Sequence, residues 1–207
     1  MHFRSNTMFK LGYQAFIMFS IVSGYTIAVM SQHKKRLLFF MVLAPQLFLV
    51  SVFPIFSVRS YFNSLKVYDG INGIGWVKSQ YQDNWSAIQW LNTQKPEGLV
   101  EADGDSYTDY NQVSTFTGFP TIIGWSVHEW LWRGSYDIVA PRKEEVRKIY
   151  ESVDINETKQ ILEKYQVTYI FVGTLERQKF TNLVESKFSD LGESVFTSGG
   201  TVIYKVH

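Results

Sequence analysis

Two long runs without a charged residue lie near the N-terminus of this 207-residue chain. Residues 11–32 and residues 37–58 contain no Asp, Glu, Lys or Arg. A helix of such a length is roughly 33 Å long, which is enough to cross a hydrocarbon core of about 30 Å. We therefore expect a membrane region over residues 1–60, with two transmembrane helices at about 11–32 and 37–58 in contact with membrane lipid.

The segment between the two runs predicts their orientation. Residues 33–36 read His-Lys-Lys-Arg, and the positive-inside rule places so basic a short loop in the cytoplasm, although Arg4, Lys10, Arg59 and Lys66 oppose this. A signal peptide is disfavoured, because the first apolar run is longer than a signal core and no small-residue cleavage site follows it. We expect a multi-pass protein of the cell membrane whose C-terminal domain is extracytoplasmic.

Polar residues within the runs, and the composition of the chain, bear on its partners. Amide and hydroxyl side chains that could pack against further helices are Gln14, Ser20, Ser23, Thr26 and Gln46. They favour a multipass membrane subunit as partner, with this chain as one part of a larger or split protein. The net charge of +1 provides no basic face for nucleic acid. The absence of cysteine excludes disulfides, thiolate metal sites and a cysteine nucleophile.

The rest of the chain predicts a layered α/β domain. After a connector over residues 61–82, we expect an extracytoplasmic domain over residues 83–207. Apolar residues at helical spacing predict helices that begin at Asp83, Arg142, Asp154 and Glu176. Apolar and β-branched runs predict strands over residues 99–102, 121–123, 167–172, 191–197 and 201–206, the last two joined as a hairpin. This order favours a mixed sheet in two or three layers.

An acidic loop follows the first predicted strand. Glu101, Asp103 and Asp105 lie within five positions, and Tyr107 comes soon after. Ligands of open α/β sheets bind at the C-terminal ends of the strands, so these residues are candidates for substrate binding. The carboxylates could instead hold a divalent cation or form a solvated turn, and no other cofactor or metal site is expected. Arg177, beyond the strongest predicted strand, is either an ion-pair partner or a second anion contact.

A tryptophan-rich segment is the second candidate site. It offers Trp125, His128, Glu129, Trp132 and Arg133. Aromatic rings stack on sugar faces, polar groups bind hydroxyls, and arginine pairs with phosphate or carboxylate. The alternative is a packing plug, with two tryptophans in the core and the arginine in an ion pair. A zinc site of the HExxH kind is excluded, because no second histidine follows at the required spacing.

These segments together resemble the C-terminal part of the YYY-type multipass membrane proteins. The residues that carry the resemblance are EADGDSY at 101–107, STFTGFPTIIGWSVHEWLWRG at 114–134, EEVRKIY at 144–150 and LEKYQVTYIFVGTLER at 162–177. The family resembles C-type glycosyltransferases, which use lipid-linked sugars on the outer membrane face. The layout also resembles the C-terminal domain of the oligosaccharyltransferase catalytic subunit, and by that analogy Trp125 to Arg133 would form the acceptor or glycan contact region.

The chain departs from that family in having two expected spans rather than many. It lacks the first outer loop, where C-type glycosyltransferases carry their catalytic acids, so catalysis by this chain alone is not expected and no catalytic residue is assigned. The leading hypothesis is a domain that binds glycan or polyprenyl-phosphate sugar in cell-surface glycan assembly. The alternative is a non-catalytic subunit that caps a multipass partner. A third hypothesis is a metal-dependent hydrolase using Glu101, Asp103, Asp105 and His128.

Overall fold

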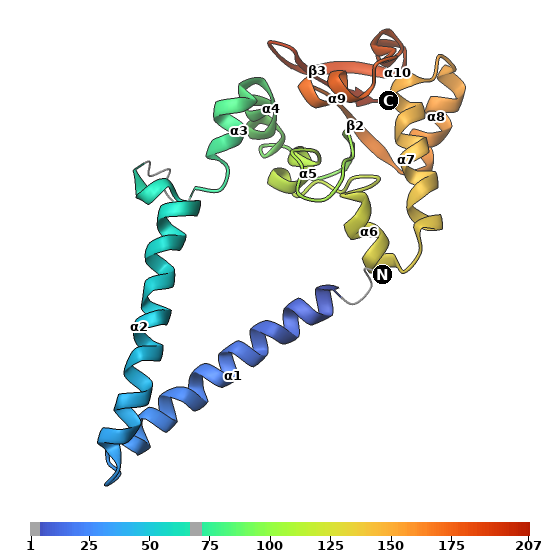
Figure 1. The fold of residues 1–207 in the computed structure, drawn as a ribbon. Coiled ribbons are helices and arrows are strands. Elements are labelled where there is room, and N and C mark those ends of the chain that lie inside the picture. The colour runs from blue at the N-terminus through green and yellow to red at the C-terminus, as the bar shows by residue number, and fades with distance from the viewer. Residues whose placement is uncertain (1–4, 67–71) are drawn as a thin grey trace. The chain divides into compact units, whose positions relative to one another are not determined.

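The computed structural model describes residues 5–66 and 72–207. The chain divides into two compact units, Met1–Gly70 and Ile71–His207 (Figure 1). Each unit is described by itself.

The first unit contains two long apolar helices, α1 (Ser5–Ser31) and α2 (Arg36–Tyr61), followed by a 3-10 turn, η1 (Asn63–Leu65). A short turn joins the helices, in which Arg36 N donates to His33 O and Lys35 N to His33 Nδ1. Both helices begin before their charge-free runs, α1 at Ser5 and α2 at Arg36, and α2 continues beyond its run to Tyr61. Part of the expected connector, residues 67–71, lies outside the described residues.

Both helices are long and apolar enough to cross a membrane. Thr7–Ser31 has a mean hydropathy of 1.5 and Arg36–Tyr61 a mean hydropathy of 2.2. Within the described residues, the most apolar stretch of each helix has no buried residue, and rings such as those of Phe19 and Phe48 are exposed. An apolar surface of this extent is typical of a segment that meets lipid or further helices. The two helices support a membrane-associated protein.

The second unit is an α/β domain built on one mixed sheet. Its elements in chain order are α3 (Gly75–Gln80), α4 (Gln82–Leu91), β1 (Gly98–Val100), α5 (Gln112–Thr117), α6 (Ser126–Arg133), α7 (Tyr136–Glu151), α8 (Ile155–Lys164), β2 (Val167–Val172), α9 (Thr174–Lys179), η2 (Glu185–Lys187), α10 (Phe188–Leu191), β3 (Gly192–Ser198) and β4 (Thr201–Val206). The strand order is β1-β2-β4-β3, with β1 parallel to β2 and the other two pairs antiparallel. The expected α/β class and mixed sheet are confirmed.

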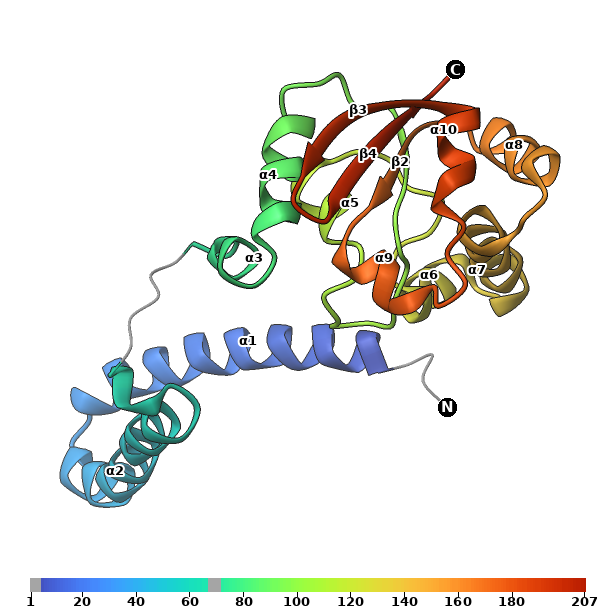
Figure 2. The same cartoon turned by 90° about the horizontal axis from the view of Figure 1, so that it is seen from above.

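The sheet separates two hydrophobic cores, so the domain has three layers (Figure 2). Successive residues of a strand point to opposite faces. In β2, Ile170 and Val172 join the core shared with α7, α8 and α10, whereas Tyr169 and Phe171 join the core shared with α3, α4 and α5. Because both faces are covered, β2 is apolar nearly throughout, as a central strand requires.

Several predicted elements are confirmed. The strand over residues 167–172 is β2, and the C-terminal hairpin is β3 and β4. The helix expected after Asp154 is α8, whose N-terminus is capped by the Asp154 carboxylate through the backbone N–H groups of Asn156 and Glu157. These are local features, which sequence patterns encode directly.

Residues 121–123 do not form the predicted strand. Thr121 makes a single bridge to Leu99, and the carbonyls beyond it accept from side chains instead of from a neighbouring strand. Arg142 Nη1 donates to Ile122 O at 2.9 Å, and Asn111 Nδ2 donates to Ile123 O at 3.0 Å. These tertiary hydrogen bonds satisfy the backbone without a ladder.

Three helix starts also differ from the prediction. Helix α4 has Tyr81 at its N-cap, and the carboxylate of Asp83 instead accepts from Gly200 N in the β3–β4 hairpin. Helix α7 begins six residues before Arg142, because Ser135 Oγ accepts from Asp137 N and caps an earlier turn. Helix α9 begins before Glu176, whose carboxylate accepts from Gly173 N.

Candidate functional site

The three acidic side chains of the loop after β1 lie in three different environments. Glu101 and Asp103 are buried, whereas Asp105 is exposed. The backbone of the loop approaches its neighbours closely: a Cβ on Gly104 would lie 2.4 Å from the Tyr110 ring, so only glycine fits there. The Gly104 carbonyl accepts from Ser126 N at 3.1 Å, which ties the loop to the start of α6.

Glu101 holds the N-terminus of α5. Its two carboxylate oxygens accept from Val113 N and Ser114 N, both at 2.9 Å. These N–H groups lie in the first turn of the helix, where no intrahelical acceptor exists. Burial raises the pKa of Glu101 to about 7, since desolvation outweighs the hydrogen bonds that favour its charged form. The structure places this predicted site residue in the interior of the domain.

Asp103 and Arg177 pair with residues that the sequence did not single out. The Asp103 carboxylate accepts from Lys179, and Lys143 Nζ lies 3.9 Å from its other oxygen. Arg177 pairs with Glu185 and donates to Gly200 O at 3.2 Å.

The tryptophan-rich segment forms α6 and one wall of an open hollow of about 700 Å³. The hollow is lined by all five residues predicted there: Trp125, His128, Glu129, Trp132 and Arg133. The rest of the lining comes from Gly124 and from Asn111, Ser114 and Thr115 of α5 and its N-cap. The i, i+3 and i+4 spacing places the predicted residues on one face of α6, which the sequence pattern allowed but did not prove.

An aromatic group consisting of Tyr107, Trp125 and His128 stands beside this hollow. The ring centroids lie 5.7 Å apart for Tyr107 and Trp125, 5.5 Å for Tyr107 and His128, and 5.4 Å for Trp125 and His128. Tyr107 is 85% exposed and has a left-handed backbone with φ of 64°. A non-glycine residue in that region is uncommon. The loop thus holds an exposed ring against α6.

Hydrogen bonds fix the members of the aromatic group. Ser106 Oγ lies 2.6 Å from His128 Nδ1. Trp125 Nε1 donates to Tyr110 O at 3.0 Å. Asp105 accepts from Ser126 Oγ at 3.2 Å, which holds the acidic loop against the N-terminus of α6. The polar edges of the His128 and Trp125 rings are therefore held by neighbouring residues.

The charged residues of α6 form an internal pair. Glu129 and Arg133 are ion-paired one turn apart, and Gly124 N donates to Glu129 at 3.4 Å. The packing-plug interpretation fits part of the segment, since Trp130 packs against the core and Arg133 is paired. It does not describe Trp132, which is 71% exposed and lines the hollow.

The structure brings together part of the predicted site. Tyr107 contacts Trp125 and His128, and Asp105 accepts from Ser126 Oγ, but neither of them lines the hollow. Glu101, Asp103 and Arg177 do not line it either. Asn111, Ser114 and Thr115 were missed, because only tertiary packing brings α5 to α6. Within residues 5–66 and 72–207, no group of three or more His, Asp or Glu side chains is placed to hold a metal ion.

No family model matches the chain, and searches of curated proteins and of solved structures find no match either. The resemblance to YYY-type proteins therefore stays a prediction, and function is argued from the site.

Proposed function

We propose that this chain is a membrane-anchored protein whose α/β domain binds glycan, or the sugar part of a lipid-linked sugar, in cell-surface glycan assembly. The observation that carries the proposal is the hollow of about 700 Å³ lined by Trp125, His128, Trp132 and the Glu129–Arg133 pair. The proposal assigns binding, and no catalytic step, to this chain.

The chemistry of the hollow suits a sugar. Sugar rings present apolar C–H faces and polar hydroxyl edges, so they are bound by aromatic rings beside hydrogen-bonding groups. Trp132 lines the hollow with an exposed ring, and the exposed ring of Tyr107 contacts Trp125 and His128 beside it. Ser114, Thr115 and Asn111 offer hydroxyl and amide groups in the lining. Ligand sites are generally concave and mostly apolar, with a few placed polar groups. The hollow has this composition.

The anchoring part of the proposal rests on α1 and α2, with the basic loop at residues 33–36 in the cytoplasm and the domain outside. Cysteine labelling tests it, because the chain has no cysteine of its own. We expect Glu193→Cys to react with a membrane-impermeant maleimide in right-side-out vesicles. Lys34→Cys should react only after permeabilisation. The reverse pattern would place the domain in the cytoplasm and remove a role on the outer face.

The binding part is tested on the full chain in a sugar-free detergent. We expect Trp132→Ala combined with Arg133→Ala to weaken binding of neutral oligosaccharides and of a polyprenyl-phosphate-linked sugar about tenfold or more, because truncating a central aromatic anchor typically costs about 2 kcal/mol. Titration followed by tryptophan fluorescence or calorimetry measures the dissociation constants.

A matched control separates binding from stability. Val153 is an exposed apolar residue that does not line the hollow, so Val153→Ala should leave the affinity unchanged. Wild-type affinity in the Trp132 and Arg133 double variant, or no binding of any glycan by the wild type, would reject the proposal.

A second candidate is a non-catalytic subunit that caps a multipass partner. It is favoured by the exposure of Gln14 and Gln46 on α1 and α2, since amides on apolar helices are stabilised by hydrogen bonds to neighbouring helices. Native mass spectrometry of the chain extracted from its own membrane distinguishes the two. A stoichiometric multipass protein, together with no glycan binding, would favour this candidate.

A further inference from the structure

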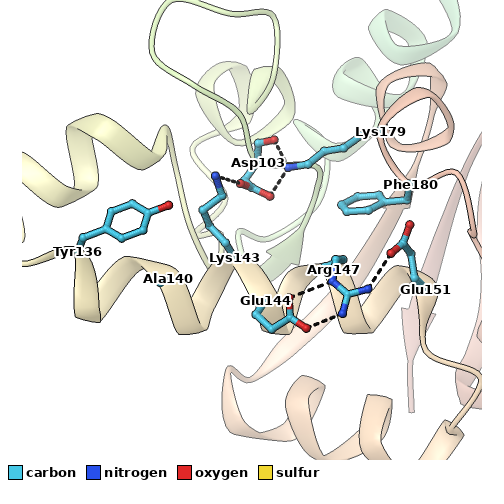
Figure 3. A pocket seen from close by; sticks show the side chains of 9 residues that line it. All are labelled: Asp103, Tyr136, Ala140, Lys143, Glu144, Arg147, Glu151, Lys179 and Phe180. Carbon is cyan, nitrogen blue, oxygen red and sulfur yellow. Dashed lines mark hydrogen bonds and ion pairs between the residues drawn. The ribbon is translucent and has the colours of Figure 1, made fainter.

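The charged residues that line the cavity between α7, α9 and the loop after β1 compensate one another (Figure 3). Two lysines pair with Asp103, and Arg147 pairs with Glu144 and Glu151. Three cations therefore face three carboxylates, and the cavity indicates no charged ligand. The hollow beside α6, in contrast, has hydrogen-bonding capacity that the domain itself leaves unused.

Asn111, which precedes α5 and lines this hollow, has an acceptor without a donor. Its Nδ2 donates to Ile123 O at 3.0 Å, and this contact fixes the orientation of the amide because only the nitrogen can donate to a carbonyl. Its Oδ1 then has no hydrogen-bond donor among the described residues, although Asn111 is 5% exposed. Buried polar atoms are ordinarily satisfied. The unmet capacity on the α5 side of the hollow is therefore that of an acceptor.

The two hydroxyls that α5 contributes to the lining are acceptors as well. Thr115 Oγ1 donates to Asn111 O at 2.6 Å, and Ser114 Oγ donates to the same carbonyl at 3.4 Å. A hydroxyl has one proton and two acceptor lone pairs. Because each proton is directed to the backbone, each hydroxyl can still accept a hydrogen bond but has no proton left to donate. The α5 side of the hollow thus suits a ligand that brings hydrogen-bond donors.

The α6 side of the hollow offers no uncompensated cation to an anionic ligand. Arg133 is the permanent cation among the described residues of the lining, and it is paired with Glu129. The Nδ1 atom of His128 is occupied by Ser106 Oγ at 2.6 Å. Phosphates and carboxylates are bound by donors and cations, whereas here they would face acceptor oxygens and a neutralised arginine. A neutral ligand with several hydroxyls fits these groups better.

We infer that the ligand of this hollow is a neutral sugar recognised through its free hydroxyls, which donate to the hydroxyl oxygens of Thr115 and Ser114. The inference rests on the proposed function and adds the substrate class: uncharged sugars with free hydroxyls, and neither uronic acids nor sugars held by a phosphate. The face of the sugar ring packs on the exposed ring of Trp132. In a lipid-linked sugar, the phosphate lies outside the hollow.

Titration of the full chain in a sugar-free detergent tests the inference. The probes are neutral oligosaccharides of glucose, galactose, mannose and N-acetylglucosamine, the permethylated form of each, and oligomers of glucuronic acid. We expect at least one neutral oligosaccharide to bind. Its permethylated form keeps the sugar rings but has no hydroxyl donor, so it should bind about tenfold more weakly or worse. The glucuronic acid oligomers should bind no better than the neutral oligosaccharides.

Three variants of α5 separate lost hydrogen bonds from the bulk of the added methyl groups. Thr115→Val replaces the hydroxyl with a methyl group of similar shape and should weaken binding of the neutral sugar about fivefold, because one hydrogen bond is lost. Thr115→Ser keeps the hydroxyl and should retain the affinity. Thr117→Val is the matched control: its hydroxyl donates to Val113 O at 2.7 Å in the same way, but Thr117 does not line the hollow. It should leave the affinity unchanged.

The outcomes distinguish this inference from the proposed function. Equal affinity for the free and the permethylated sugar, or wild-type affinity in Thr115→Val, would overturn the inference and leave glycan binding in place. Tighter binding of glucuronic acid oligomers than of every neutral probe would overturn it in the same way. Failure of the wild type to bind any of these sugars would reject the proposed function, and the inference with it.

Discussion

The Glu101→Ala variant is expected to lose about 3 kcal/mol of unfolding free energy at about pH 5, because it leaves two buried N–H groups without acceptors and opens a cavity. The groups are those of Val113 and Ser114, at the first turn of α5. Urea unfolding of the full chain in detergent, followed by tryptophan fluorescence, measures the loss.

The pH dependence of the same group provides an independent check. Burial raises the folded-state pKa of Glu101 from 4.5 to about 7. Between these values the folded state binds more protons than the unfolded state. The contribution of Glu101 to stability is therefore fully present below about pH 4.5 and is lost as the pH rises through about 7. The difference between the two pKa values corresponds to roughly 3 kcal/mol of unfolding free energy.

Two variants isolate this effect. Glu101→Gln cannot titrate, so the difference in stability between it and the wild type should shrink between about pH 5 and pH 8. The neighbouring Glu176 also has a raised pKa owing to burial, but it is present in both proteins. Glu163→Ala, on the exposed face of α8, should change stability by no more than about 0.5 kcal/mol. An unchanged pH profile in Glu101→Gln would show that Glu101 does not titrate in this range.

The largest loss of stability is expected for Tyr150→Ala, at roughly 3 to 5 kcal/mol, as for other large aromatic residues of a core. Tyr150 is fully buried, and its ring stacks on Phe180 with centroids 4.4 Å apart. Its hydroxyl lies 3.1 Å from Val100 O and 2.8 Å from Phe171 O, so it bridges β1 and β2 at the edge from which the acidic loop leaves.

Tyr150→Phe separates packing from hydrogen bonding. It keeps the stacked ring and removes the single hydroxyl proton that the two carbonyls share, so a loss of about 1 to 2 kcal/mol is expected. Tyr107→Ala, which truncates an exposed ring, should lower stability by less than about 1 kcal/mol. Urea unfolding at constant pH measures all three. Equal losses in Tyr150→Phe and Tyr150→Ala would show that the hydroxyl, rather than the ring, holds the two strands.

The patterns that predicted structure correctly are local ones. The charge-free runs predicted two long apolar helices, the apolar run at residues 167–172 predicted β2, and Asp154 predicted the start of α8. Residues 121–123 have an equally strand-like pattern, yet Arg142 and Asn111 bind their carbonyls from distant parts of the chain. A sequence window contains no information about such donors.

The candidate site was also predicted only in part. The composition of residues 125–133 marked them as a candidate site, but no helix was predicted there. Trp125, His128, Glu129, Trp132 and Arg133 line one hollow because α6 and its N-cap carry them on one face. Nothing in the spacing distinguished Asp105, which faces α6, from Asp103, which faces Lys179, or from Glu101, which caps α5. Lys143 and Lys179 likewise lie far from Asp103 in sequence.

The sequence by itself determined two apolar helices, the α/β class of the domain that follows them, and the tryptophan-rich segment at residues 125–133 as a candidate site. Each of these depends on residues within a few turns of one another, where hydrophobic periodicity and capping act. The tertiary structure decided which loop side chains are buried, which contact α6, and which pair with Lys143 and Lys179. Those outcomes depend on the burial of polar groups, whose partners come from elements separated by tens of residues.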